Sequence, residues 1–193
     1  MQQEKHHYYI FHKPYGYLSQ FVNNQTKRKN KKLLGELYNF SEGTMAIGRL
    51  DENSEGLLLL TTNGKVSHYI TSHNIEKEYF VEVDGLITED AILSLKKGVT
   101  ISINGKPYNT KPCEVAKIES IKKYPIQARM VRDERHGPTS WISIILTEGK
   151  FRQVRKMTAA AGFPTLRLVR VRIGNIWIGD MQPGDVKSVE NLQ

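Results

Sequence analysis

The chain has 193 residues, 39% of them hydrophobic and 25% charged, an ordinary composition for a globular protein with an adequate core. Lys and Arg outnumber Asp and Glu by 28 to 20, and the net charge of +8 favours a polyanionic partner, most commonly nucleic acid; a charge that only maintains solubility is the alternative. The single cysteine, Cys113, excludes an internal disulfide and a zinc site built on cysteines.

The first third of the chain is predicted to contain more strands than helices. Apolar patterns and turn residues predict a strand at 7–13, an exposed loop with five positive charges at 23–32, a helix at 32–40, and strands at 45–50 and 57–62. The helix rests on the helical spacing of Leu33, Leu34 and Leu37, and Asn63-Gly64 is a turn signal.

The rest of the chain mixes both kinds of element. Residues after the turn predict a helix at 65–72, a strand at 76–85, a helix at 88–98, a hairpin at 99–110 and a strand at 113–121. A polar loop at 122–140 is followed by a predicted strand at 141–149, a helix at 151–162 and a strand at 165–174. This order indicates an α+β fold with a mixed, mainly antiparallel sheet and flanking helices, formed by one domain over 1–193 or two closely packed lobes.

Several kinds of chemistry lack their sequence signals. Neither phosphate-binding glycine motif is present, so no nucleotide cofactor is expected, and the six scattered histidines predict no metal site. Ser54 lacks the first glycine of a nucleophile elbow, which argues against a serine hydrolase. No apolar run approaches the roughly 20 residues of a membrane span, and no signal segment precedes the first strand, so the prediction is a cytoplasmic protein with no membrane partner.

An acidic turn, "GRLDENSEG" (48–56), separates two apolar segments. If the preceding strand continues through it, Arg49 and Asp51 emerge on one face while Leu50 enters the core. Acids also collect on turns for solvation alone. A functional interpretation leaves a hydrolase that uses Asp51 with Glu52 or Glu55 as one alternative.

A basic cluster occupies residues 148–174. On the predicted helix Arg152, Arg155 and Lys156 share a basic face, and Val154, Met157 and Ala161 share an apolar one. The following strand carries Arg167, Arg170 and Arg172, with a slip in alternation at Val169 that suggests a bulge. The cluster favours contact with a phosphate backbone, either in an enzyme or in a non-catalytic RNA-binding module; arginines that guard a sheet edge are the alternative.

Three segments resemble, in order, the motifs of RsuA-type bacterial pseudouridine synthases. "HKPYG" (12–16) is similar to their K-P-x-G motif, and "GRLDENSEGLLLLTTNG" (48–64) to G-R-L-D-x-x-S-x-G-L-L-L-L-T-N-[DN]-G. "LTEGKFRQVRKM" (146–157) is similar to L-x-E-G-x-x-R-Q-V-R-R-M. The resemblance covers about 150 residues. It implies a pseudouridine synthase fold, and it implies conversion of uridine in RNA to its C5-linked isomer with no redox cofactor, nucleotide or metal.

The resemblance also assigns residues. It implies that Asp51 acts on the substrate as a nucleophile or as a base, that Tyr79 stacks on the extruded base, and that Arg155 pairs with Asp51. The residues expected to bind RNA are Lys13, Arg49, Lys77, Lys150, Arg152, Gln153, Lys156, Arg170 and Arg172. The first motif begins at Lys13, so the S4 RNA-binding domain of many relatives is expected to be absent. The expected partner is large-subunit (23S) ribosomal RNA near the peptidyl-transferase region, bound by a monomer.

Overall fold

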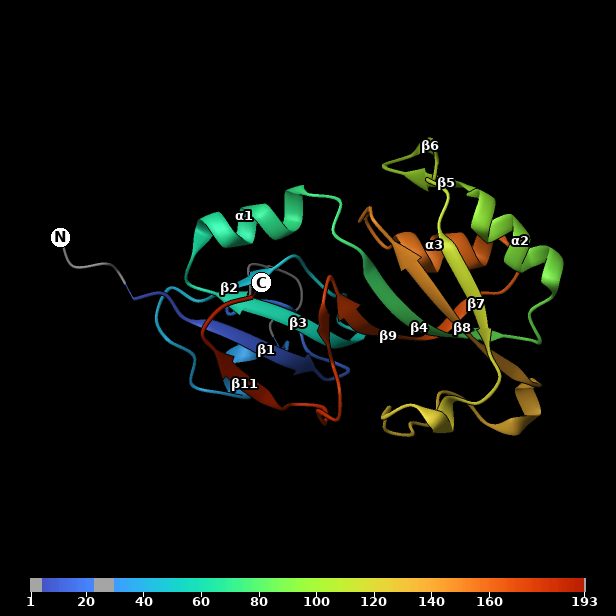
Figure 1. The fold of residues 1–193 in the computed structure, drawn as a ribbon. Helices are drawn as coiled ribbons and strands as arrows, with labels where there is room; N and C mark the ends of the chain where they lie inside the picture. Colours follow the sequence, from blue (N-terminus) through green and yellow to red (C-terminus); the bar gives the residue numbers. More distant parts are fainter. Residues whose placement is uncertain (1–4, 23–29, 193) are drawn as a thin grey trace.

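A computed structural model describes residues 5–22 and 30–192 (Figure 1). Its strands are β1 (Tyr8–Lys13), β2 (Met45–Ile47), β3 (Glu55–Thr61), β4 (Lys77–Asp84), β5 (Thr100–Ile103), β6 (Lys106–Asn109), β7 (Glu114–Ile118), β8 (Thr139–Leu146), β9 (Thr165–Ile173), β10 (Ile176–Trp177) and β11 (Val186–Val189). Its helices are α1 (Gly64–Ser72), α2 (Glu89–Lys97) and α3 (Gln153–Ala160), with 3-10 turns at Leu34–Glu36, Ile121–Lys123 and Glu134–His136.

Within the described residues, a nine-stranded mixed sheet organises the molecule in two halves. The first half-sheet contains β11, β1, β3 and β2, and the second contains β9, β4, β8 and β7 with β10, all paired antiparallel. In Figure 1, α1 lies above the first half-sheet and α2 and α3 lie above the second, beside the small β5–β6 hairpin. This arrangement confirms the predicted α+β class with a mainly antiparallel sheet and flanking helices.

The two half-sheets meet at one short parallel contact between β3 and β9. Only Glu55 and Gly56 pair there, with Val169 and Arg170. Gly56 has φ +104, and a Cβ atom at this position would lie 2.2 Å from the backbone oxygen of Arg170. Glycine therefore permits the close approach of the two backbones that joins the halves.

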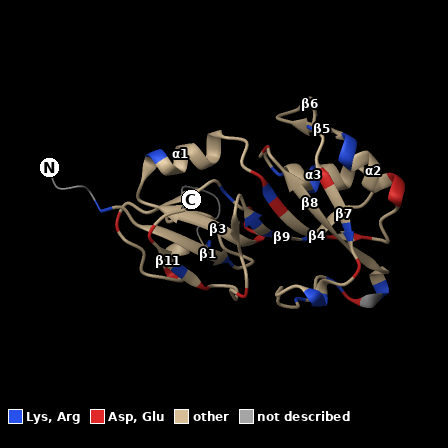
Figure 2. Cartoon of the chain, viewed as in Figure 1, with Lys and Arg blue, Asp and Glu red and all other residues tan. Residues whose placement is uncertain are grey.

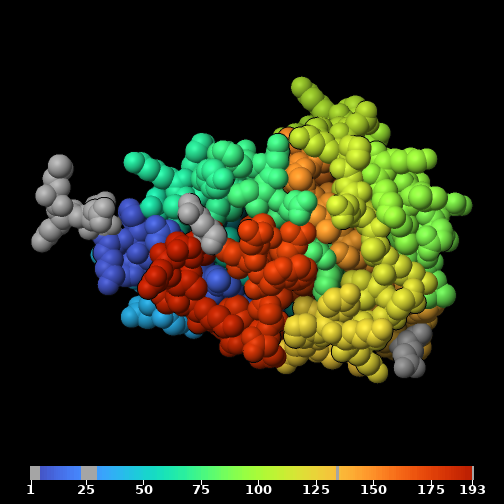
Figure 3. Space-filling view, viewed as in Figure 1, coloured from blue at the N-terminus to red at the C-terminus, as the bar shows by residue number. Residues whose placement is uncertain are grey.

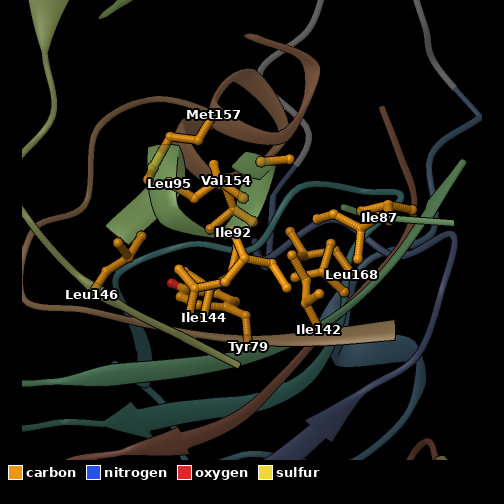
Figure 4. Packing of buried hydrophobic residues seen from close by; sticks show 14 of the residues in the cluster. Tyr79, Ile87, Ile92, Leu95, Ile142, Ile144, Leu146, Val154, Met157 and Leu168 are labelled. Atoms are coloured by element: carbon orange, nitrogen blue, oxygen red, sulfur yellow. The ribbon is translucent and has the colours of Figure 1, made fainter. Parts of the chain in front are cut away.

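The core lies on both faces of the sheet. On the second half-sheet, Tyr79, Val81 and Val83 of β4 face α2 and α3, where they pack with the residues drawn in Figure 4. Phe80 points to the opposite face, so β4 alternates as a strand buried on both sides should. Leu50 is buried in the core under α2 and α3, which confirms its predicted inward direction.

The predicted helix over 32–40 is wrong. The segment forms a single 3-10 turn at Leu34–Glu36, with Gly35 in its middle. Phe40 instead packs edge-on against Tyr9, Phe11 and Phe21, and these tertiary contacts outweigh the helical spacing of the leucines.

The turn signal at Asn63-Gly64 marks the start of α1, which Asn63 caps, because its side chain accepts hydrogen bonds from the backbone N–H groups of Lys65 and Val66. One local prediction needs correction. The irregularities of β9 lie not at Val169 but at Leu166 and Val171, which have no partner in the β4 register. Most of the basic loop predicted at 23–32 lies outside the described residues.

Among residues 5–22 and 30–192, no helix is both long and apolar enough to cross a membrane.

Candidate active site

A cavity of about 480 Å³ lies on the helix side of the molecule, where the two halves meet. Its wall comes from the acidic turn, the C-terminal end of α1 (71–74), the start of β4, the segment 146–154 that leads into α3, and β9. In Figure 3 the end of α1 (teal) meets the segment around residue 150 (orange). A volume of this size accommodates a single nucleoside.

Asp51 is held at the cavity by a turn that is fixed at both ends. The Ser19 hydroxyl donates to the backbone oxygen of Leu50 at 2.8 Å and accepts from its N–H at 3.0 Å, and the Ser54 N–H donates to the Asp51 backbone oxygen at 3.0 Å. β2 ends at Ile47, so the strand does not continue through the acidic turn. The prediction that Arg49 and Asp51 share one face of a strand depended on that continuation. Arg49 and Asp51 nevertheless both line the cavity.

Two guanidinium groups face the Asp51 carboxylate. Nη1 of Arg152 donates to Oδ2 at 2.8 Å, and Nε of Arg155 lies 3.7 Å from the same oxygen. The predicted Arg155–Asp51 ion pair is therefore present, but the direct hydrogen bond comes from Arg152. Arg152 adopts the left-handed conformation (φ 53), which costs about 1 kcal/mol for a residue with a side chain.

Arg155 is fixed by the turn it faces. Its Nη2 donates to the Asn53 backbone oxygen at 2.8 Å and to the Ser54 hydroxyl at 3.1 Å. Its Nε has no hydrogen-bond partner within the described part of the chain. Burial, and then the neighbouring Arg152, lower the pKa of Arg155 from its ordinary value, while Asp51 opposes this shift. The Nε donor lies 3.7 Å from Oδ2 of Asp51, and Arg155 itself is not part of the cavity lining.

Tyr79, Lys77 and Arg170 form another part of the cavity wall. Tyr79 is 9% exposed, and Figure 4 shows it beside Ile144 in the core cluster. Burial, and then Arg170, lower the pKa of Lys77, whose Nζ donates to the Ile75 backbone oxygen at 2.8 Å. Arg170 is buried, and its Nη2 has no hydrogen-bond partner among the residues the structure describes.

Lys13 does not lie where an RNA contact requires it. Its side chain is fully buried, and its Nζ donates to the Pro14 backbone oxygen at 2.9 Å. Burial lowers the pKa of Lys13 to about 7, against the opposing effect of Glu55, Asp51 and Glu52. The structure thus corrects the prediction that Lys13 binds RNA. The buried residue instead supports the acidic turn from inside the protein.

A hydrogen-bonded hub around Glu148 closes another side of the cavity. Glu148 accepts from the Tyr108 hydroxyl at 2.6 Å, from the Lys111 N–H at 3.0 Å and from the Gln153 amide. Burial raises the pKa of Glu148, but these hydrogen bonds outweigh it and the net shift is downward. Gln153, predicted to bind RNA, is buried and joins this hub while lining the cavity. No local pattern predicted this hub, because Tyr108 and Glu148 are 40 positions apart in the sequence.

The remaining basic residues divide into two groups. Lys150 is exposed at the cavity, above the Tyr108 ring. Lys156 lies outside the cavity lining and donates to the Ser102 backbone oxygen at 2.7 Å. Arg172 also lies outside, and its guanidinium is paired with Glu76 at 3.0 Å and Glu78 at 2.9 Å. Its charge is therefore compensated by two carboxylates, and its role in RNA binding stays a prediction.

β9 is an interior strand, so its arginines do not guard a sheet edge. Arg167 is buried and pairs with the buried Glu55 at 3.0 Å. Figure 2 shows acidic and basic residues adjacent at the centre of the sheet, where β4 and β9 run together. Neither Glu55 nor Glu52 lines the cavity, which argues against the hydrolase that would pair Asp51 with one of these two acids.

Comparison with known proteins places this geometry in context. The family model described as RNA pseudouridylate synthase matches residues 7–160. The chain is 42% identical over 185 residues to ribosomal large subunit pseudouridine synthase E of Vibrio parahaemolyticus, covering 94% of this chain and 73% of the relative. It is 40% identical over 177 residues to the protein of that name from Xanthomonas campestris, covering 91% of each.

Solved structures agree on the fold. A crystal structure titled pseudouridylate synthase has a TM-score of 0.74 at 23% identity and covers 98% of this chain and 72% of that one. Human RNA pseudouridylate synthase domain containing 1 has a TM-score of 0.56 at 15% identity over 90% of this chain and 76% of that one. The segments "KPYGYLSQF" (13–21), "PTSW" (138–141) and "GFPTLRLVR" (162–170) predict particular likeness to synthase E, and the curated relatives confirm it.

Proposed function

The chain belongs to the RNA pseudouridylate synthase family, and on this premise we propose that it isomerises a uridine of large-subunit (23S) ribosomal RNA, near the peptidyl-transferase region, to pseudouridine. The names of its relatives, ribosomal large subunit pseudouridine synthases, support this substrate class. The catalytic domain spans residues 1–193, acts as a monomer in the cytoplasm and needs no cofactor.

The observation that carries the proposal is a single carboxylate held by two guanidinium groups in a cavity of nucleoside size. In the reaction the N1–C1′ bond breaks, the base turns, and a C5–C1′ bond forms. The proton lost from C5 is balanced by a proton gained at N1, so no oxidant or reductant enters. One ionised carboxylate serves this chemistry, either by attacking the substrate as a nucleophile or by removing a proton as a base.

The neighbours of Asp51 have distinct roles in this proposal. Arg152 and Arg155 hold the Asp51 carboxylate in position, through a hydrogen bond and a longer ion pair. Tyr79 offers its ring to the extruded base, as unstacked bases require. Arg170 presents an unused, buried donor to a uracil carbonyl, because the base enters the cavity that Arg170 lines.

The RNA backbone is bound by the rim of the cavity. The exposed Arg49, Arg152 and Lys150 contact phosphates directly. Lys77, Gln153 and Lys156 shape and support this rim through hydrogen bonds to backbone oxygens and to the Glu148 hub.

The test uses unmodified 23S ribosomal RNA transcribed in vitro. The wild-type protein is incubated with the transcript, and pseudouridine is mapped by carbodiimide-blocked primer extension. We expect one modified uridine in the peptidyl-transferase region. A small-subunit transcript is incubated in parallel. Modification of that transcript alone would contradict the substrate, and release of free uracil would contradict the reaction.

Asp51→Asn is the matched variant, because it keeps the size of the side chain and removes its charge. We expect no pseudouridine and an unfolding transition like that of the wild type. Pseudouridine formed at a measurable rate by this variant would remove Asp51 from the reaction.

A further inference from the structure

Tyr15 and Arg129 form an exposed stack outside the cavity. Tyr15 follows β1 in the chain, and Arg129 belongs to the polar loop between β7 and β8, drawn in yellow in Figure 1. The guanidinium carbon of Arg129 lies 4.4 Å from the centre of the Tyr15 ring. Planar contact with a guanidinium covers one face of the ring and orients it.

The stack is attached to the segment that carries Asp51. The N–H of Gly16 donates to the Glu52 backbone oxygen at 2.8 Å, and Arg129 pairs with Glu55 at 3.1 Å. Tyr15 and Arg129 also lie close enough to Arg155 to act on its pKa, after the larger effects of burial, Arg152 and Asp51. Both partners are therefore held in position beside the cavity.

The ring of Tyr15 is exposed in a way that packing does not explain. Tyr15 is 46% exposed, and its hydroxyl makes no hydrogen bond to any described residue. Three other tyrosines are similarly exposed, but each contacts another aromatic ring: Tyr38, Tyr69 and Tyr124. Tyr15 differs because its ring contact is with a guanidinium group.

The charge around the stack suits RNA. Four arginines share two carboxylates here: Arg129 and Arg167 pair with Glu55, and Arg152 and Arg155 pair with Asp51. A second exposed aromatic–arginine stack, Trp177 with Arg172, has the opposite balance, because one arginine there shares two carboxylates. Excess positive charge beside an aromatic ring is the arrangement that binds single-stranded nucleic acid.

We propose that Tyr15, backed by Arg129, is a stacking subsite for an unpaired nucleobase adjacent in the RNA to the uridine that enters the cavity. The subsite rests on the proposed function and adds to it a contact that positions the substrate. Stacking is tolerant of base identity, so the subsite selects an unpaired neighbour rather than a particular base.

The experiment uses a fragment of 23S ribosomal RNA that carries the mapped target uridine. KM and kcat are measured for the wild type, Tyr15→Ala, Tyr15→Phe and the control Trp177→Ala. We expect Tyr15→Ala to raise KM about 5- to 150-fold, the range for loss of one stacked base, with kcat unchanged. Tyr15→Phe retains the ring and should keep the wild-type KM, as should Trp177→Ala.

A second series places an abasic nucleotide on each side of the target. RNA binding is measured by fluorescence anisotropy. At one of the two positions, the abasic nucleotide should weaken RNA binding by the wild type as much as Tyr15→Ala weakens binding of the intact RNA. The combination of both changes should add nothing, because they remove the same contact.

An unchanged KM in Tyr15→Ala would overturn the subsite. A fall in kcat or in the unfolding midpoint with KM unchanged would also overturn it, since Tyr15 would then only support the acidic turn. If the wild type makes no pseudouridine, the proposed function fails. In that case the subsite is decided by anisotropy of the wild type and Tyr15→Ala on an unstructured single-stranded RNA, which needs neither turnover nor a mapped target; equal affinities would overturn the subsite.

Discussion

Asp51 contacts two arginines that differ in their exposure. The Arg155 side chain is 12% exposed and is hydrogen-bonded to the acidic turn, whereas that of Arg152 is 40% exposed and donates a hydrogen bond to the carboxylate. Water and salt screen the exposed pair, although its atoms are closer. The more distant, buried arginine is therefore expected to interact more strongly with the Asp51 carboxylate.

Replacing the two arginines separately tests this order. We predict that Arg155→Ala lowers kcat about 100-fold, the cost of removing one charge-stabilising donor, because it also frees the turn at Asn53. Arg152→Ala should chiefly raise KM. Pseudouridine formation over a range of RNA concentrations measures both effects, and equal losses of kcat in the two variants would contradict the prediction.

Lys13 makes stability depend on pH. Its folded-state pKa is about 7, below the ordinary value of 10.5, because the charged form is buried. Between these pH values the unfolded chain binds more protons than the folded one. The free energy of unfolding contributed by this group therefore rises with pH from about 7 to about 10.5.

Comparison with Lys13→Met measures this contribution. Urea unfolding from pH 7 to 10 should show a steeper rise for the wild type than for the variant, by at most about 1.4 kcal/mol per pH unit. Parallel curves for the two proteins would show that Lys13 keeps its charge when buried.

At the scale of elements, the contact between β3 and β9 positions the site. It is the short parallel contact that joins two antiparallel half-sheets, and it lies at the end of the acidic turn. The turn and the start of α3 come from different halves, so the approach of Asp51 to Arg152 depends on this contact. Gly56 sets how closely the halves approach.

We predict that Gly56→Ala lowers the free energy of unfolding by about 2–4 kcal/mol and reduces activity, since the strands must separate and φ is strained. Gly64→Ala is the control, because Gly64 begins α1 with open space around its Cα. That change should be neutral or stabilise by up to about 1 kcal/mol. Equal stabilities in denaturant would refute the role of Gly56.

In the whole molecule, the net charge does not show which cationic side chains are available to bind RNA. The chain carries +8, yet Arg167 and Arg172 of β9 are paired with carboxylates inside the sheet. The charge available to RNA lies instead at the cavity rim, where Arg49 and Lys150 are exposed. Binding should therefore depend on salt through a few rim residues.

Salt titration of RNA binding tests this distribution. The logarithm of the binding constant should fall linearly with that of the salt concentration, and each of Arg49→Gln and Lys150→Gln should reduce the slope by about 0.7. Lys117→Gln, on the edge strand β7, serves as a control that leaves the slope unchanged. A flat salt response of the wild type would contradict phosphate binding at the rim.

Much of the fold follows from local signals. Alternation predicts β4 and β8, and caps and apolar spacing predict α2. Two of the three motifs contain Asp51 and Arg155, and the roles of these residues and of Tyr79 are predictions from the family resemblance. The segment 32–40 could not be predicted in the same way, because aromatic contacts with β1 and Phe21 decide its conformation.

The sequence by itself determined the family, the mixed sheet and the carboxylate on which the proposed chemistry depends, since these are carried by short motifs and local periodicity. Only the tertiary structure decided which cations are available. Lys13, Arg167 and Arg172 resemble RNA ligands in the sequence but are buried or paired, whereas Arg152 contacts Asp51 directly. Charge is visible in a sequence, but burial and the identity of a charge's partner arise only when distant strands meet.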